Sequence, residues 1–199
     1  MRLEESAAFA GGDYRVENAT AGEIQLLMEA PLRQVIEEAD PHCVLRAAKV
    51  LQFENHEQGF DVRCRVDLAS KGTAPPDPGT ISPAQFTVGL EMVINLLAPN
   101  VPDRSIEFAG GRKPLEWSGV VDGPRVRLVD EWQDVAVEIE ARGAGQLWIS
   151  PIQTVSESEE GFERVYQGSQ ILAVWNVTLD PKEPWSAETV LHVSAARSA

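Results

Sequence analysis

The chain has 199 residues, with 17 Lys or Arg against 31 Asp or Glu, which gives a formal net charge of −14. Its 43% hydrophobic and 24% charged content excludes wholesale disorder and fibrous repeats, and its length fits one large all-β domain or two small domains. Nucleic acids and anionic membranes are bound through clustered Lys and Arg, so we expect neither as a partner.

The N-terminal segment, residues 1–17, is acidic and lacks the apolar core that a signal peptide needs. No stretch of the sequence approaches the roughly 18 apolar residues of a membrane span. Cys43 and Cys64 are too few for a disulfide scaffold and have no metal-binding spacing, so we interpret them as small apolar side chains in strands. The sequence therefore predicts a cytoplasmic protein without a metal ion or cofactor.

One segment near the N-terminus has helical spacing. Within residues 30–39, Leu32, Val35 and Ile36 lie at i, i+3 and i+4, and Pro41 would end the run. The pattern is compatible with a short helix or with a turn.

The dominant periodicity along the rest of the chain is two, which is typical of half-buried strands. Asp61, Arg63, Arg65 and Asp67 are expected on a charged outer face, and residues 44–53 and 187–193 on further strands. The inward-facing rows predicted in chain order are Phe60, Val62, Cys64, Val66 and Leu68; Phe86, Val88, Leu90, Met92, Ile94 and Leu96; Val126 and Leu128; Val135, Val137 and Ile139; and Ile171, Ala173, Trp175, Val177 and Leu179.

Gly and Pro mark the connections between these strands. Residues 71–83 and 99–114 are expected to be long loops, and 143–145 a turn. Asp122-Gly123 predicts a hairpin. Many strands with little helix predict an all-β fold, an antiparallel β-sandwich or barrel, in a single domain over 1–199. Within that domain, residues 1–21 are expected to be an edge or poorly ordered segment.

The most distinctive stretch is LWISPIQTVSESEEGFERVYQGSQILAVW, residues 147–175. Together with QFTVGLEMVINLL (85–97) and VRLVDEWQDVAVEIE (126–140), it resembles the C-terminal β-sandwich of glycoside hydrolase family 57, which includes α-amylases and 4-α-glucanotransferases. Glu91 and Asn95 have the spacing of a Glu and an Asn in that family. The matching motif positions are Trp148, Pro151, Ile152, Thr154, Val155, Ser156, Ser158, Glu159, Gly161, Phe162, Glu163, Tyr166, Gln167, Gly168 and Ser169.

The resemblance implies a galactose-mutarotase-like supersandwich that lacks the family's catalytic barrel. It therefore implies a non-catalytic module that binds α-glucan or serves an amylase or glucanotransferase as an accessory domain. The alternative is a structural subunit that packs on a separate catalytic polypeptide. Residues 156–161 form an acidic, polar loop beside aromatic rings, which suits sugar hydroxyls and pyranose faces as well as an ordinary solvated hairpin tip. The expected carbohydrate-binding residues are Trp148, Glu159, Glu163, Tyr166 and Gln167.

An enzyme that acts by itself is the other alternative. Glu159 and Glu163 are the carboxylate pair to inspect for glycoside hydrolysis. A mutarotase-like epimerase needs a general acid and base, for which His42, His56 and His192 are available. Nothing in the sequence places two of these histidines together. His56 is expected in a hairpin turn, and His192 is expected to point outward.

A cluster of carboxylates offers a further reading. Asp130, Glu131 and Asp134 could bind Ca²⁺ or simply form an acidic strand connection. Among the tryptophans, Trp175 is expected in the core. Trp117, Trp132 and Trp185 lie near turns or strand ends, where they would serve as sugar platforms or cover an end of the sandwich.

Overall fold

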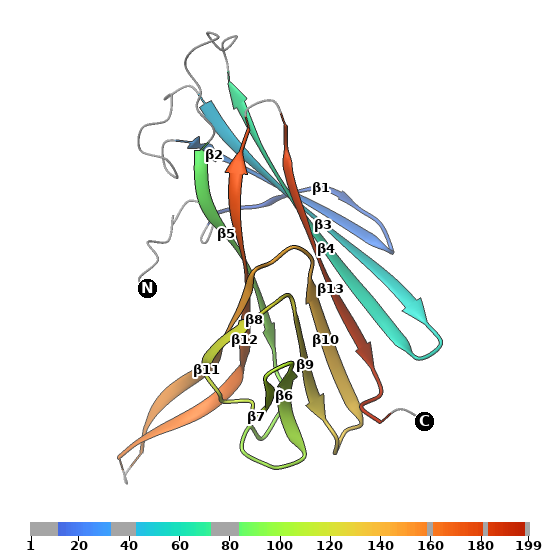
Figure 1. Ribbon diagram of the computed structural model, residues 1–199, viewed down its shortest axis with the longest axis vertical. Coiled ribbons are helices and arrows are strands. Elements are labelled where there is room, and N and C mark those ends of the chain that lie inside the picture. The colour runs from blue at the N-terminus through green and yellow to red at the C-terminus, as the bar shows by residue number, and fades with distance from the viewer. Residues whose placement is uncertain (1–11, 33–42, 73–83, 159–160, 181–182, 198–199) are drawn as a thin grey trace. The chain divides into compact units, whose positions relative to one another are not determined.

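The computed structural model describes residues 12–32, 43–72, 84–158, 161–180 and 183–197 (Figure 1). Within these residues the chain forms strands and no α-helix. The strands are β1 (Arg15–Ala19), β2 (Glu23–Pro31), β3 (Cys43–His56), β4 (Gly59–Gly72), β5 (Ala84–Ile94), β6 (Arg104–Phe108), β7 (Gly111–Lys113), β8 (Gly119–Asp122), β9 (Arg125–Asp130), β10 (Val135–Ala141), β11 (Gln146–Ser158), β12 (Gly161–Leu179) and β13 (Trp185–Ser194). No helix that is long and apolar enough to cross a membrane occurs in this part of the chain.

The strands belong to two sheets. One sheet has the hydrogen-bonded order β1-β2-β3-β4-β13-β10-β9-β6-β7, and the other has the order β5-β12-β11-β8. The pairs β2–β3, β9–β10, β10–β13 and β11–β12 are all antiparallel. β1 is an edge strand of the larger sheet, so residues 15–19 lie at its border. The predicted all-β antiparallel fold is thus confirmed.

The contacts divide the chain into two compact units. The first comprises residues 1–53, 63–86 and 177–188, and the second comprises 54–62, 87–176 and 189–199. The core of the first unit is formed by inward rows on β2, β3, β4 and the end of β12. Its buried residues include Leu27, Ala30, Leu45, Ala47, Cys64, Val66, Leu68, Val177 and Leu179. Cys43 and Cys64 are buried thiols on strands, as predicted, and burial raises the pKa of the Cys64 thiol.

The core of the second unit is formed by strands of both sheets. Rows of β9 and β10 in the larger sheet and of β11 and β12 in the smaller sheet are buried. Their members include Val126, Leu128, Val137, Ile139, Leu147, Ile149, Ile171, Ala173 and Trp175. Trp175 is a core residue, as predicted, and its Nε1–H donates to the carbonyl of Arg142 at 2.9 Å. Burying these side chains supplies the main driving force for folding of the unit.

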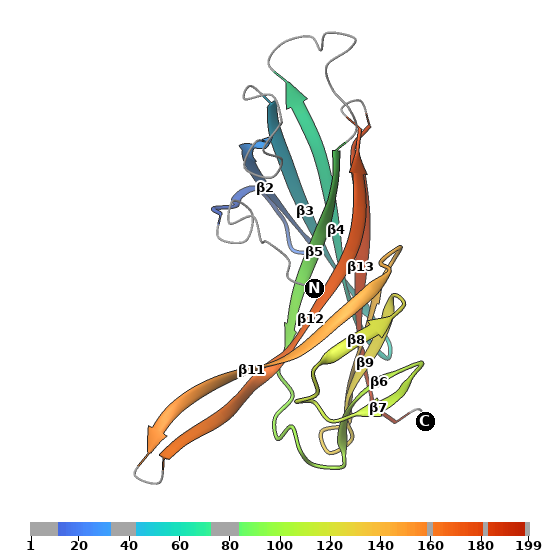
Figure 2. The same cartoon turned by 60° about the vertical axis from the view of Figure 1, so that its left-hand side comes forward.

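The far end of the β11–β12 hairpin extends as a two-stranded ribbon (Figure 2). On β11 residues 153–157 are exposed, and on β12 residues 161–165 are exposed. The exposed side chains include Val155, Phe162 and Val165, and Phe162 is 78% exposed. We call this segment, residues 153–157 with 161–165, the β11–β12 arm. Its strands pair as far as Ser158 and Gly161, so the sequence 156–161 does connect two strands as predicted.

The structure corrects two predicted connections. Residues 99–114 contain two short strands, β6 and β7, at the edge of the larger sheet, rather than only a loop. Asp122-Gly123 is a turn but does not close a hairpin, because β8 pairs with β11 while β9 pairs with β10 and β6. The chain crosses from one sheet to the other here, and the Gly123 amide donates to the carbonyl of Gly145 at 3.0 Å.

Two other predictions are corrected or fall outside the described residues. Pro31 ends β2, and Leu32 is buried just beyond it, whereas the rest of the predicted helix lies outside the described residues, as does 73–83. At the start of β4 the burial differs from the expectation, although the alternation of side chains is kept. Phe60 is 42% exposed and Asp61 is buried. The side chains of His56 and His192 contact the Asp61 carboxylate.

Candidate functional site

A shallow hollow lies on the outer face of the smaller sheet. Its apolar floor is a row across three strands, because Trp148 on β11 pairs with Leu172 on β12 and with Val120 on β8. The hollow has a volume of about 280 Å³ and is also lined by Ser118, Ser150 and Gln170. Trp148 is half-buried, and its indole N–H donates to Oε1 of Gln146 at 3.3 Å.

The next row of the same face is polar. Ser150 and Gln170 pair across β11 and β12, and the Ser150 hydroxyl donates to Oε1 of Gln170 at 2.8 Å. A flat aromatic surface beside neutral amide and hydroxyl groups matches a pyranose ring, which has apolar faces and a rim of hydroxyls. The sequence prediction included Trp148 but missed Ser150 and Gln170. Ser150 is two positions from Trp148, and Gln170 is two positions from Leu172. Because residues i and i+2 of a strand lie on the same face of a sheet, this spacing could have placed Ser150 and Gln170 in the site.

The other predicted binding residues lie on or beside the β11–β12 arm. Glu163 is exposed and pairs with Ser156, and Glu159 lies outside the described residues. Gln167 is the extra residue of a β-bulge, because the register passes from Ile152–Gly168 to Gln153–Tyr166. Its amide donates to Thr154 Oγ1 at 3.2 Å.

Tyr166 is half-buried and faces the base of the arm. Its hydroxyl lies 2.7 Å from Ser169 Oγ, and Ser169 donates to the carbonyl of Leu115 at 2.9 Å. The single hydroxyl hydrogen of Ser169 is used in the bond to this carbonyl. The Tyr166 hydroxyl is therefore the donor in its bond with Ser169. Burial raises the pKa of Tyr166. The hydrogen bond with Ser169 acts in the opposite direction but is the weaker effect. Ser169 therefore joins β12 to the segment before β8, and Tyr166 donates to it from the same strand.

Gly168 has a similar structural role. A Cβ at this position would lie 3.1 Å from Val93 Cγ1 and 3.2 Å from the carbonyl oxygen of Ile94, so the glycine allows β5 to approach β12. Gly168 and Ser169 of the motif thus have contacts within the fold, whereas a role of Tyr166 and Gln167 in binding stays a prediction.

Among the predicted binding residues that the structure describes, Trp148 lies apart from Glu163, Tyr166 and Gln167. Trp148 lies opposite Leu172, which is six positions along β12 from Tyr166 and nine from Glu163. At about 3.3 Å per residue these separations are roughly 20 and 30 Å. Trp148 lies in the hollow, whereas Glu163, Tyr166 and Gln167 belong to the arm and its base.

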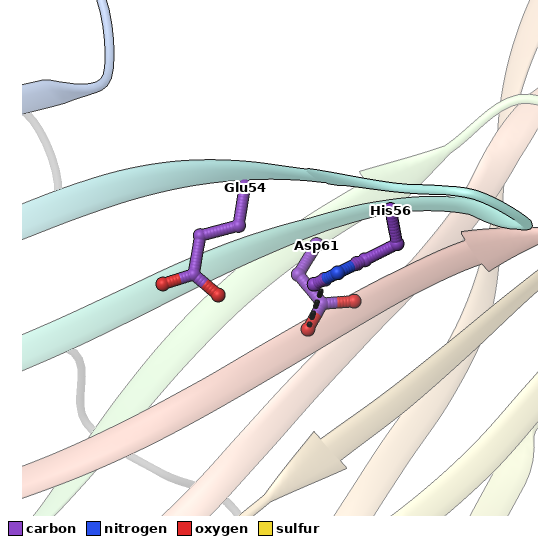
Figure 3. Close-up of side chains that lie close together, drawn as sticks. All are labelled: Glu54, His56 and Asp61. Atoms are coloured by element: carbon purple, nitrogen blue, oxygen red, sulfur yellow. Dashed lines mark ion pairs between the residues drawn. The ribbon is translucent and has the colours of Figure 1, made fainter.

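A second group of polar side chains lies at the β3–β4 hairpin (Figure 3). His192 Nδ1 on β13 lies 2.6 Å from Asp61 Oδ1, and His56 Nε2 lies 3.4 Å from Asp61 Oδ2. Glu54 is close enough that one ligand atom each from Glu54, His56 and Asp61 lie within 4.8 Å of one another. The hydrogen bond from His192 holds the pKa of Asp61 below its ordinary value despite partial burial, and His56 adds to this effect.

The sequence placed no two histidines together, but the structure brings His56 and His192 to the same carboxylate. The rings of His56 and His192 lie 6.4 Å apart, with Asp61 in contact with both. His56 does end the strand before a hairpin turn, as predicted. The proximity of Glu54 and Asp61 could have been predicted from the sequence, because a two-residue hairpin connection places them opposite each other. No local pattern could place His192 beside them, since it is 131 residues from Asp61.

The carboxylates considered for Ca²⁺ have other partners. Asp130 is fully buried and accepts hydrogen bonds from Arg104 Nε at 2.8 Å and from the Gln133 amide at 2.9 Å. Glu131 accepts from Arg112 at 2.8 Å, and Asp134 from the backbone amide of Arg197 at 3.0 Å. Among the described residues these three do not form a ligand cluster. The reading as an acidic strand connection fits them better.

The other tryptophans differ in exposure. Trp132 is 79% exposed in the β9–β10 turn. Trp117 stacks on Phe108 with ring centroids 5.3 Å apart, and Trp185 is half-buried on β13. Trp117 is thus partly covered by an aromatic neighbour, and its role as a sugar platform or as an end cover stays a prediction.

A family model for the C-terminal domain of α-amylase/4-α-glucanotransferase matches residues 2–189. α-Amylase 1 of Dictyoglomus thermophilum is 35% identical over 109 residues, which are 52% of this chain and 15% of the relative. The chain thus spans a small part of that protein's length.

Solved structures agree on the fold. A 4-α-glucanotransferase from Thermococcus litoralis covers 92% of this chain with a TM-score of 0.54 and 20% identity, over 22% of its own length. A putative aldose 1-epimerase from Escherichia coli K12 covers 92% of this chain and 69% of its own, with a TM-score of 0.60 and 11% identity. A galactose mutarotase-like protein from Lactobacillus casei gives a TM-score of 0.55 at 10% identity, over 92% of this chain and 73% of its own. The predicted mutarotase-like β-sandwich is confirmed.

Proposed function

Since the chain belongs to the family of C-terminal domains of α-amylases and 4-α-glucanotransferases, we propose that it is a non-catalytic accessory module that binds α-glucan. The observation that carries this proposal is the row Val120–Trp148–Leu172 beside the polar pair Ser150 and Gln170. A cytoplasmic location stays a prediction from the sequence.

The hollow suits one ring of a sugar chain. Its volume of about 280 Å³ lies just below the range of small-molecule sites, which is about 300–1,000 Å³, so it suits a single sugar ring. One face of a glucose ring would lie on Trp148, and the hydroxyls at its rim would bond to Ser150 and Gln170 in place of water. The lining has no ionisable side chain, which suits a neutral ligand.

The test is a titration of the protein with maltoheptaose, followed by tryptophan fluorescence, with released or epimerised sugar assayed in the same tubes. We expect saturable quenching without turnover. Trp148→Ala removes the aromatic platform and should weaken binding up to about tenfold, because contacts with an aromatic face contribute about 0.5–1.5 kcal/mol. Gln170→Ala should weaken it less.

Trp132→Ala is the matched control, because it removes an exposed tryptophan from a turn outside the hollow. It should leave the affinity unchanged. Glu163→Ala, Tyr166→Ala and Gln167→Ala belong to the same series, since their role in binding stays a prediction, and so does that of Glu159. Equal affinity in the wild type and Trp148→Ala would refute the hollow as the site, and turnover that Glu163→Gln removes would refute a non-catalytic role.

The β11–β12 arm favours a second candidate function, which is docking on a catalytic polypeptide of the same family. Val155, Phe162 and Val165 expose apolar surface on a ribbon. The relatives above are longer than this chain, which suits a domain that works beside another. Phe162→Ser should then reduce co-purification with an α-amylase or glucanotransferase chain, while Trp132→Ala should not. If the Phe162→Ser variant recovers as much of the catalytic chain as the wild type does, docking through the arm is contradicted.

A further inference from the structure

We propose that Glu54, His56 and Asp61 form a Zn²⁺-binding site at the β3–β4 hairpin, with His192 as the residue that positions Asp61. The proposal is independent of glucan binding, because it concerns the larger sheet and none of the residues that line the hollow.

The local chain explains why these three side chains share one face. Glu54 and His56 are two positions apart on β3, so they point to the same side of the sheet. β3 ends at His56 and β4 begins at Gly59, and this two-residue connection sets Asp61 opposite Glu54. Figure 3 shows the carboxylates and the imidazole on one side of the hairpin.

The distances fit a small divalent ion. Zn²⁺ binds imidazole nitrogen and carboxylate oxygen at about 2.0–2.2 Å, so tetrahedral ligand atoms lie about 3.3–3.6 Å apart. His56 Nε2 and Asp61 Oδ2 are 3.4 Å apart. The three potential ligand atoms lie within 4.8 Å of one another. A rotamer change of the exposed Glu54 side chain would complete the set.

His192 holds Asp61 in place for this role. Its Nδ1 lies 2.6 Å from Asp61 Oδ1, which leaves Oδ2 directed toward His56. Partners of this kind outside the ligand set fix the orientation of metal ligands. His192 is also fixed by the sheet, since it pairs with Glu138 on β10. The site therefore joins the tip of the hairpin to β13.

The donor set selects the class of metal. One imidazole with two carboxylates offers too few oxygens for the six to eight ligands of Ca²⁺, and imidazole suits Zn²⁺ better than Mg²⁺. Three protein ligands leave a position for water, as in open zinc sites. Because the unfolded chain does not assemble the three ligands, Zn²⁺ should stabilise the folded state.

The experiment uses the full chain after treatment with EDTA. Zn²⁺ is titrated at neutral pH against a chromophoric chelator, and the melting temperature is measured with and without Zn²⁺. We expect a single equivalent to bind at micromolar or lower concentration and to raise the melting temperature. His56→Gln and Glu54→Gln should each lower the affinity at least about 100-fold, and His192→Gln about 10–100-fold.

Two variants serve as controls. Glu57→Gln removes an acidic side chain from the same turn, and His42→Gln removes the third histidine of the chain. Both should bind Zn²⁺ like the wild type. The exposed positions of Glu54 and His56 should keep these variants folded, which circular dichroism verifies.

Three results would overturn the proposal. They are no binding at millimolar Zn²⁺, an affinity of His56→Gln and Glu54→Gln equal to that of the wild type, and a Co²⁺ derivative whose spectrum shows thiolate ligation by the cysteines.

Discussion

Replacing Asp130 by Asn should lower the free energy of unfolding by about 3–5 kcal/mol. Asp130 is fully buried, and Arg104, whose side chain is 10% exposed, donates to it at 2.8 Å. The substitution removes the negative charge and leaves the guanidinium in a largely dry site. Asp103 lies 3.5 Å from Arg104 but compensates only in part, since it is more exposed. Urea unfolding of the wild type and the variant measures the difference.

Glu131→Gln is the matched control. Glu131 is the next residue and also pairs with an arginine, Arg112, at 2.8 Å, but both side chains are more than one-third exposed. A surface pair contributes about 0–1 kcal/mol, so this variant should unfold almost like the wild type. Similar losses in both variants would show that burial of the Arg104–Asp130 pair does not set its contribution.

The same pair predicts how stability depends on pH. Burial raises the pKa of Asp130, but the bonds from the Gln133 amide and from Arg104 outweigh it, so the pKa lies below its ordinary value. A carboxylate with a lowered folded-state pKa stabilises the fold above the unfolded-state pKa of about 3.9. The contribution is lost as the pH falls through the folded-state pKa. The difference between wild type and Asp130→Asn should therefore shrink below about pH 4, and a constant difference down to strongly acid pH would contradict the assignment.

Gly59→Ala should destabilise the fold by the sum of two effects. Gly59 has φ of +153°, and holding a side chain in such a conformation costs about 1–3 kcal/mol. The added Cβ would also lie 1.8 Å from the backbone oxygen of Val193, so β4 or β13 must shift, which costs about 1–3 kcal/mol more. Urea unfolding in EDTA measures the loss without any contribution from bound metal.

Gly123→Ala separates the two effects. Gly123 has φ of +111°, but a Cβ there would meet nothing within 4 Å. This variant should therefore show the conformational cost alone, and Gly59→Ala should lose clearly more. Equal losses at the two positions would mean that the contact with Val193 relaxes at little cost.

Most of the long strands and their buried faces could be predicted from the local sequence alone. The row from Ile171 to Leu179 is buried at every second residue, Trp175 included. This could be predicted because the alternation of side chains along a strand is local and needs no knowledge of its neighbours. The motif in 147–175 likewise indicated the family, because its residues are contiguous.

Other features depended on contacts that short-range patterns do not encode. Asp122-Gly123 has the composition of a hairpin turn, but the pairing of β8 with β11 decides that the chain changes sheets there. The separation of Glu163 from Trp148 also depends on pairing, because the register of β11 and β12 sets the position of each residue along an extended hairpin.

Each of the two candidate sites also combines features that local sequence predicts with features that depend on strand pairing. The motif singled out Trp148 as a candidate for carbohydrate binding, but the hollow beside it exists because β8, β11 and β12 set Val120, Trp148 and Leu172 side by side. At the hairpin, Glu54, His56 and Asp61 are placed by a short turn, whereas His192 reaches them only through β13. The local order of residues sets which residue types each strand presents on each of its faces. Which faces meet depends on strand pairing, because pairing joins residues that are far apart along the chain.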